Sequence, residues 1–495
     1  MSALALLFWT SAALTRNANV FQLPVSVLTD EYDTGVLLLT LQGLINRHPD
    51  ALTPLFLNTV GVFSQFPRAD AHWVHYLETT KNVTFANYTA SGVSGLLAAI
   101  LDASDGRIGG VVLYDAVAPE PDATRYIALN LCGLESLLPV TPALRRAYPR
   151  LAALPVRHDL RKRWATNGAA YAFALSSLMP RANRSVGWSA GRTHRDDAGW
   201  EVWQGGPPEM ALLGLDIAIA RSGFIFNLTP NATGCDVPRS GFISNLTRRA
   251  RGAPDSSSTS RRIHLQPHSA TATATCRGSP QEASLFDAIM EGLNTTVAGS
   301  LPSLPAIYGW SEPESEYTQR VSRGGGYVLC SEAPNLSFWA FFAIAPGALH
   351  NAFGRAARAA AAARPPPPLD TKTYVVFQTN EGDTPKIVAG LFGGSWLNPK
   401  RGAVAIAWGI NLLLCREFPA LMEYFAASAS ANDTFFAGTS GAGYVYPSIM
   451  PAAAFTRYAQ QVERVSAIYS APPATGAPAD WGVDIWNWGV PEGTL

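Results

Sequence analysis

The stretch Thr34-Gly-Val-Leu-Leu-Leu-Thr-Leu-Gln-Gly-Leu-Ile-Asn46 is a helix-length apolar run near the start of the chain. Short apolar runs typical of buried strands follow at 53–57 and 108–114, and helical patterns occupy 96–101 and 126–137. Strands that alternate with helices favour a parallel sheet with both faces covered. Residues 22–233 therefore predict an N-terminal three-layer α/β domain.

The second half of the chain repeats this alternation. Strand-like runs at 304–308, 326–330, 374–377, 403–408 and 434–437 alternate with helical patterns at 285–293, 338–363 and 415–427. Residues 281–495 therefore predict a C-terminal (β/α) barrel-like domain, complete or incomplete, with its chemistry at the carboxyl ends of the strands. Residues 234–280 are polar and repetitive, which predicts a low-complexity insertion between the two domains.

Composition excludes several classes of protein. The 495 residues contain 37 Lys and Arg against 37 Asp and Glu, so a nucleic-acid partner or an anionic membrane surface has no electrostatic signature here. Apolar residues make up 47%, which excludes wholesale disorder. The five cysteines lack metal-ligand spacing, and His350 is the only histidine after residue 280. A histidine-rich zinc site or a Ser-His-Asp triad is therefore not expected in the second half.

The N-terminus and the glycosylation sequons point to the secretory pathway. Residues 1–14 form an apolar run too short to span a bilayer, with Ser11 and Ala13 placed for cleavage. We interpret residues 1–21 as a signal peptide and lead-in; the alternative is a buried N-terminal segment. Asn-X-Ser/Thr sequons occur at Asn82, Asn87, Asn183, Asn227, Asn231, Asn245, Asn294, Asn335 and Asn432. The sequence thus predicts a secreted or lumenal, N-glycosylated protein without a membrane span.

Carboxylates at predicted strand ends are the candidates for catalysis. Glu381 and Asp383 follow the strand-like run at 374–377. Such a pair can divide acid and base roles, can hold one cation together with Asp433, or can simply cap the next helix. Glu316 and Glu332 follow two other predicted strands. Either supplies the second carboxylate that a glycosidase needs, or belongs to a solvated surface.

The stretch Gly438-Thr-Ser-Gly-Ala-Gly-Tyr-Val-Tyr-Pro447 is the most distinctive in the chain. Gly441 and Gly443 permit backbone conformations closed to other residues. Tyr444 and Tyr446 are two residues apart, so an extended backbone places both on one side, facing either a pocket or the core. The stretch lacks the lysine of a phosphate-binding loop, and its spacing fails the last position of a nucleophile elbow.

Gly441-Ala-Gly-Tyr-Val-Tyr-Pro447 resembles the motif that names the GxGYxYP putative glycoside hydrolase family. The stretches that support the resemblance, in chain order, are Leu39-Thr-Leu-Gln-Gly-Leu-Ile-Asn46, Tyr308-Gly-Trp310, Pro334-Asn-Leu-Ser337, Glu381-Gly-Asp383 and Ala407-Trp-Gly-Ile-Asn411. The family's acidic loop often has the form Asp-Gly-Asp-Asn. In this chain Glu381 replaces the first Asp and Thr384 replaces the Asn, which shifts one carboxylate by about one methylene.

The resemblance implies hydrolysis of a carbohydrate substrate, a poly- or oligosaccharide. Glu381 and Asp383 then serve as acid, base or nucleophile, with Glu316 or Glu332 as partner. The aromatic faces of Tyr444, Tyr446, Trp310 and Trp408 line the sugar subsites with Asn335 and Asn411, and Gly441, Gly443 and Pro447 shape the motif backbone. No cofactor is expected; a divalent cation at Glu381, Asp383 and Asp433 is the open alternative. A glycan-binding protein without catalysis is the second hypothesis.

Overall fold

We describe the protein from a computed structural model. The structure describes residues 18–24, 32–48, 54–58, 69–87, 92–104, 106–115, 123–189, 212, 214–226, 228, 280–294, 304–309, 314–329, 335–342, 344, 348–349, 375–379, 384–392, 394–438 and 440–469. The predicted cleavage region and nearly all of the predicted insertion at 234–280 lie outside these residues.

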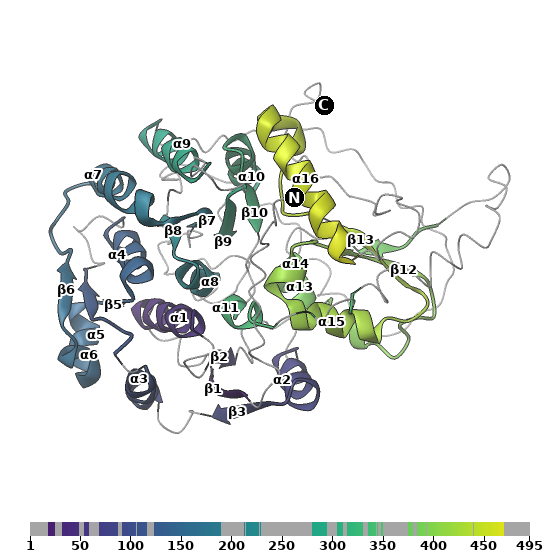
Figure 1. The fold of residues 1–495 in the computed structure, drawn as a ribbon, viewed down its shortest axis with the longest axis horizontal. Helices are drawn as coiled ribbons and strands as arrows, with labels where there is room; N and C mark the ends of the chain where they lie inside the picture. The colour runs from purple at the N-terminus through teal and green to yellow at the C-terminus, as the bar shows by residue number, and fades with distance from the viewer. Residues whose placement is uncertain are drawn as a thin grey trace, which may run out of the picture.

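The described strands form four separate parallel sheets (Figure 1). Their orders are β2-β1-β3, β5-β4-β6, β10-β9-β7-β8 and β11-β12-β13. The strands are β1 (Ala18–Pro24), β2 (Leu55–Asn58), β3 (Val83–Asn87), β4 (Val111–Leu113), β5 (Leu138–Val140), β6 (Val156–Asp159), β7 (Asn183–Ser189), β8 (Gly223–Phe226), β9 (Ala306–Gly309), β10 (Tyr327–Leu329), β11 (Gln378–Thr379), β12 (Ile406–Ile410) and β13 (Asp433–Ala437).

The apolar run near the N-terminus forms the central helix α1 (Tyr32–Asn46), which lies in the middle of the molecule with the sheets around it (Figure 1). Every residue from 34 to 46 is buried. A largely apolar helix is stable only when other elements surround it, and this one packs on β2, β5 and three further helices. Its Gly43 lies against α8 (Leu215–Ala220), where an added Cβ would stand 2.4 Å from the Asp216 carbonyl oxygen.

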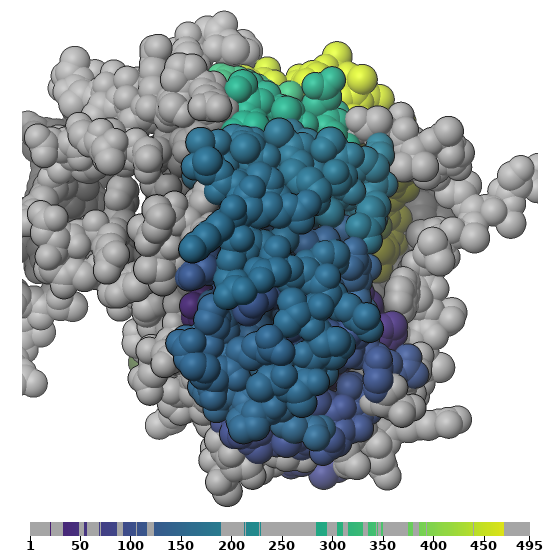
Figure 2. All heavy atoms as spheres, turned by 90° about the vertical axis from the view of Figure 1, so that its left-hand side faces the viewer, coloured from purple at the N-terminus to yellow at the C-terminus, as the bar shows by residue number. Residues whose placement is uncertain are grey.

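The other helices cover the sheets. They are α2 (Ala69–Thr80), α3 (Gly92–Ala103), α4 (Ala123–Glu135), α5 (Pro142–Ala147), α6 (Pro149–Ala153), α7 (Asn167–Phe173), α9 (Pro280–Asn294), α10 (Glu314–Arg323), α11 (Leu336–Trp339), α13 (Thr384–Ala389), α14 (Leu414–Glu417), α15 (Pro419–Ser428) and α16 (Ala452–Tyr469). Figure 2 shows that the part of the chain coloured blue, which contains β4 to β7, fills the middle of the face turned to the viewer.

The predicted mixed α/β class with parallel sheets is confirmed. The described strands do not close into one barrel; they form short sheets of three or four strands. One of these sheets pairs β7 with β9, so it joins strands from both sides of the predicted insertion. The division of the chain into two domains stays a prediction.

Three element predictions need correction. The strand predicted at 374–377 is not a buried strand: Val375, Val376 and Phe377 are 57–76% exposed, and only Gln378–Thr379 pairs with β12. The helix predicted at 338–363 is not continuous, because α11 ends at Trp339; residues 350–363 of this prediction lie outside the described residues. The helix predicted at 415–427 is split by Pro419, which begins α15 because proline suits the first turn of a helix. No helix in the described part of the chain is long and apolar enough to cross a membrane.

Candidate active site

The segment from Gly438 to Pro447 joins two sheets. Tyr444 pairs with Val328 of β10 in an antiparallel bridge, with hydrogen bonds of 2.8 and 2.9 Å between their backbones. At the other end of the segment, the Leu412 amide beyond β12 donates to the Gly441 carbonyl oxygen at 3.0 Å. The segment therefore fixes the edge of the β10 sheet to the carboxyl ends of the β12 and β13 strands.

The glycines of the segment are required by its backbone. Gly441 and Gly443 have φ angles of 91° and 107°, a region that favours glycine. A Cβ on Gly443 would stand 2.3 Å from the ring of Tyr327. The adjoining helix α16 completes the segment: the Tyr458 hydroxyl donates to the Gly443 carbonyl oxygen at 3.0 Å, and the Gln461 amide donates to the Ala442 carbonyl oxygen at 3.1 Å.

Tyr444 and Tyr446 point to the same side, as their spacing predicts, and both pack in the core. Their side chains are buried, their rings lie 5.7 Å apart and their hydroxyl oxygens are 3.3 Å apart. Val445 points the other way into a different part of the core. Of the two alternatives for the tyrosines, the structure shows core packing. Pro447 begins a 3-10 turn directly after them.

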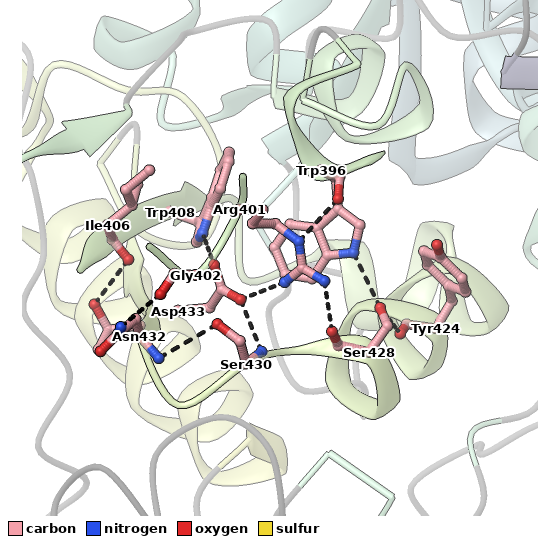
Figure 3. Close-up of polar contacts among 11 residues, drawn as sticks. Trp396, Arg401, Gly402, Ile406, Trp408, Tyr424, Ser428, Ser430, Asn432 and Asp433 are labelled. Carbon is pink, nitrogen blue, oxygen red and sulfur yellow. Dashed lines mark hydrogen bonds and ion pairs between the residues drawn. The ribbon is translucent and has the colours of Figure 1, made fainter. Parts of the chain in front are cut away.

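Asp433 lies at the centre of a closed polar network (Figure 3). One carboxylate oxygen accepts from the Trp408 indole at 2.9 Å; the other accepts from the Ser430 amide at 2.7 Å and pairs with the Arg401 guanidinium. Burial alone would raise the pKa of Asp433, but hydrogen bonds from Ser430 and Trp408 and the charge of Arg401 lower it. Arg401 also stacks on Trp396, with 4.2 Å between the guanidinium carbon and the ring centre.

This network accounts for two predicted site residues. Trp408 is buried and donates its indole N–H to Asp433. Both oxygens of Asp433 already have protein donors. Asp433 is also the first residue of β13 and pairs with Ile406 at the start of β12. The acidic loop begins at the opposite end of this sheet, since Thr379 ends β11.

Asn335 and Asn411 are buried and make structural hydrogen bonds. The Asn411 side chain accepts from the Leu413 amide at 3.0 Å. The Asn335 side-chain oxygen accepts from Gln42 on α1 at 2.7 Å, and its neighbour Ser337 bonds Asn46 at 3.0 Å. Two of the stretches that carried the family resemblance, 39–46 and 334–337, thus meet in the centre of the molecule.

Of the four candidate catalytic carboxylates, the structure describes only Glu316. Glu316 lies on α10, half-buried, with its carboxylate 2.6 Å from the Arg320 guanidinium one turn later. Glu381, Asp383, Glu332 and Trp310 lie outside the described residues. Each of them follows a described strand in the sequence, since β9 ends at Gly309, β10 at Leu329 and β11 at Thr379. The structure therefore fixes the strands that lead into these loops. Their catalytic and binding roles stay predictions.

The structure contains a buried ion pair that no sequence pattern predicted. The Glu417 carboxylate on α14 pairs with Arg221 at 3.1 Å and accepts from the Tyr308 hydroxyl at 2.9 Å. Burial alone would lower the pKa of Arg221, but the Glu417 charge raises it. The second Glu417 oxygen has no hydrogen-bond partner in the described part of the chain. Of these three residues, only Tyr308 belongs to a stretch that the sequence singled out, Tyr308-Gly-Trp310. Arg221 and Glu417 are 196 residues apart in the sequence, so no local pattern links them.

The described residues contain no group of three or more histidine, cysteine, aspartate or glutamate side chains that could hold a metal ion. Cys132 and Cys415 are buried free thiols, and burial raises the pKa of Cys415 to about 12. Cys235, Cys276 and Cys330 lie outside the described residues.

Comparison with known proteins supports the family resemblance. Residues 371–468 match the family described as the GxGYxYP putative glycoside hydrolase C-terminal domain. The structure of a putative hydrolase from Bacteroides thetaiotaomicron VPI-5482 is similar, with a TM-score of 0.61 at 15% sequence identity. The similarity covers 92% of this chain and 69% of that one, and at this identity it shows the fold alone. No curated protein matches the chain.

The match includes the acidic loop, β11 to β13, the motif segment and almost all of α16. Residues 371–468 are therefore similar to the GxGYxYP C-terminal domain, in agreement with the resemblance that the motif indicated.

Proposed function

We propose that the protein is a glycoside hydrolase that cleaves a poly- or oligosaccharide by carboxylate acid/base chemistry. The observation that carries this proposal is the family match over residues 371–468, which includes both Glu381 and Asp383. The fold similarity to a bacterial putative hydrolase is consistent with it.

The arrangement of the strands supports a site at one edge of the C-terminal sheet. Strands β11, β12 and β13 are parallel, so their carboxyl ends lie at the same edge. In α/β proteins this edge is where ligands bind. The acidic loop follows β11, Asn411 follows β12 and the motif segment follows β13. A loop that leaves this edge can bring a carboxylate to a sugar without disturbing the core.

A glycosidase needs a second carboxylate across the scissile bond, about 5 Å away for retention or about 6.5–9.5 Å away for inversion. We favour Glu332 as this partner. It follows β10, the strand that pairs with the motif segment at Tyr444. Glu316 is less suited, because its carboxylate is already paired with Arg320.

We also propose that the protein is secreted and that Asn82 carries a glycan. Asn82 is exposed at the end of α2, and its sequon threonine, Thr84, is exposed as well. In contrast, the side-chain amides of Asn183 and Asn432 donate to carbonyl oxygens of Arg221 and Gly402, and Asn335 is buried. A mass shift on endoglycosidase treatment that is smaller by one glycan in Asn82→Gln is the expected result; a secreted protein with the same shift in wild type and Asn82→Gln, or with none, would contradict the proposal.

The test of the hydrolase function is turnover on a panel of oligo- and polysaccharides by the full chain and by Glu381→Gln and Asp383→Asn. Glu463→Gln is the matched control, since Glu463 is an exposed carboxylate on α16 of the same domain. We expect turnover to fall about 10²–10⁴-fold in at least one loop variant and to stay unchanged in the control. Binding without turnover, unaffected by either loop substitution, would instead identify a glycan-binding protein.

The same turnover assay, repeated with a chelator of divalent ions, tests the cation-dependent alternative. Because both oxygens of Asp433 have protein donors, we expect chelation of divalent ions to leave the turnover unchanged. Loss of turnover on chelation, with recovery on adding back one divalent ion, would contradict acid/base chemistry by carboxylates alone.

A further inference from the structure

A cluster of polar side chains lies at the carboxyl end of β4, in a different sheet from the one that leads into the acidic loop. Tyr114, the residue that follows β4, is fully buried, and its hydroxyl donates to one carboxylate oxygen of Asp33 at 3.0 Å. The Arg125 guanidinium lies 3.5 Å from the same oxygen. Asp33 is in the first turn of α1 and Arg125 in the first turn of α4. Three elements thus direct polar side chains to one point.

The topology of this sheet places the group where α/β proteins bind ligands. The strand order is β5-β4-β6, so β4 is central, and the chain leaves it first for β5 and then crosses to β6 on the other side. The crevice at the carboxyl end of a strand where the order reverses is a recurrent ligand site. The group at Tyr114 stands at this position.

The group is partly open and is not saturated by protein donors. The side chains of Asp33 and Arg125 are 30% and 17% exposed. The second oxygen of Asp33 has no hydrogen bond to any residue that the structure describes. A partly buried carboxylate oxygen without a protein donor can accept a hydrogen bond from a polar ligand that completes the group.

The charges select the class of ligand. A guanidinium 3.5 Å from the carboxylate opposes a metal cation there, and the carboxylate opposes an anion. The balanced pair instead offers acceptors and donors side by side, which suits neutral hydroxyl groups that both donate and accept. Adjacent hydroxyls on a sugar ring provide this pattern.

We propose that Asp33, Tyr114 and Arg125 form a second, non-catalytic sugar-binding site at the carboxyl end of β4. In it, Asp33 accepts from one sugar hydroxyl with its second oxygen, and Arg125 donates to a neighbouring one. Tyr114 positions the carboxylate; burial, and then the Asp33 charge, raise the pKa of Tyr114 well above its usual value, so its hydroxyl remains a donor. The site takes its ligand class from the proposed function but shares no residue with the acidic loop.

The test is isothermal titration of the full chain with neutral gluco- and xylo-oligosaccharides and with oligogalacturonate. The variants are Asp33→Asn, which keeps an acceptor for Tyr114, and Arg125→Met, which keeps the apolar stem. Asp102→Asn is the matched control, because Asp102 also pairs with an arginine, Arg150, but at an exposed surface. Melting temperatures verify that each variant is folded.

We expect a neutral oligosaccharide to bind about tenfold more weakly to Asp33→Asn and Arg125→Met at one site, and equally well to Asp102→Asn. Equal binding by all four proteins, or binding of the galacturonate alone, would overturn the site. The hydrolase proposal fails separately: Asp383→Asn would then keep its turnover whatever Asp33→Asn does to binding.

Discussion

Two aspartates of this protein have the same kinds of hydrogen-bond partner but differ in how exposed their carboxylates are and in how many donors they have. Asp433 has Arg401 and the Trp408 indole; Asp33 has Arg125 and the Tyr114 hydroxyl. The Asp433 side chain is 1% exposed and both of its oxygens have donors. The Asp33 side chain is 30% exposed and has donors at one oxygen.

The difference follows the position of each aspartate on its sheet. Asp433 is the first residue of β13, at the amino end, where it closes the turn that begins at Ser430. Asp33 meets β4 at its carboxyl end, where helix N-termini gather. The same residue types therefore stabilise the fold in one place and remain open to a ligand in the other. Saturation by protein donors, rather than residue type, separates the two roles.

The largest expected effect is at Gly443, in the motif segment that packs against β10. Gly443→Ala adds a Cβ 2.3 Å from the Tyr327 ring at a φ of 107°, which should destabilise the protein by about 2–6 kcal/mol. Gly106→Ala is the matched control, because its φ is 74° but no atom lies within 4 Å of an added Cβ. Urea denaturation measures both. Equal losses of stability would show that backbone strain alone, and not the contact with β10, makes the glycine necessary.

The second effect tests the closed network directly. Asp433→Ala leaves Arg401 buried without its partner and removes the acceptor of the Trp408 indole. Breaking a buried ion pair in this way costs about 3–5 kcal/mol. We expect a loss of this size in the free energy of unfolding. A loss under about 1 kcal/mol would mean that water replaces the carboxylate, and the network would then not be closed.

The same aspartate gives a pH dependence. The pKa of Asp433 in the folded protein lies below its ordinary value, so the ionised form stabilises the fold. This contribution is fully present above the unfolded pKa, about 4, and is lost as the pH falls through the lower folded pKa. Wild type should therefore lose stability below about pH 4 more steeply than Asp433→Asn. Parallel curves of melting temperature against pH would contradict the assignment.

The smallest effect belongs to an exposed pair. Asp102 and Arg150 are 67% and 47% exposed, so the solvent screens their attraction. Asp102→Asn should change the free energy of unfolding by less than about 0.5 kcal/mol. A change above about 1 kcal/mol in urea denaturation would show that an aspartate–arginine pair stabilises this protein regardless of burial.

The sequence predicts those parts of the fold that depend on local patterns. The run at 34–46 is largely apolar and forms the buried central helix, and the alternation of strands and helices correctly predicts parallel sheets. Phe377 shows the limit: an apolar run resembles a buried strand, but 375–377 lies exposed at the edge of its sheet. An apolar run alone does not say whether another strand covers it.

The sequence predicted features of the candidate site only within recognisable motifs. The spacing of Tyr444 and Tyr446 predicts that they share one side, but only the pairing with β10 shows that this side is the core. The pairs Arg221 with Glu417 and Asp33 with Arg125 join residues 196 and 92 positions apart. Such contacts arise from the packing of elements and leave no pattern in a single sequence.

The most direct test of the central claim measures binding and turnover on the same samples of wild type, Asp383→Asn and Glu463→Gln. The claim is that the loop after β11 performs the chemistry while the closed network and the motif segment hold the fold. We predict that Asp383→Asn keeps the melting temperature and binds the oligosaccharide within about threefold of wild type, but loses at least about 100-fold in turnover. An Asp383→Asn variant that hydrolyses the same sugar at the rate of Glu463→Gln would contradict the account.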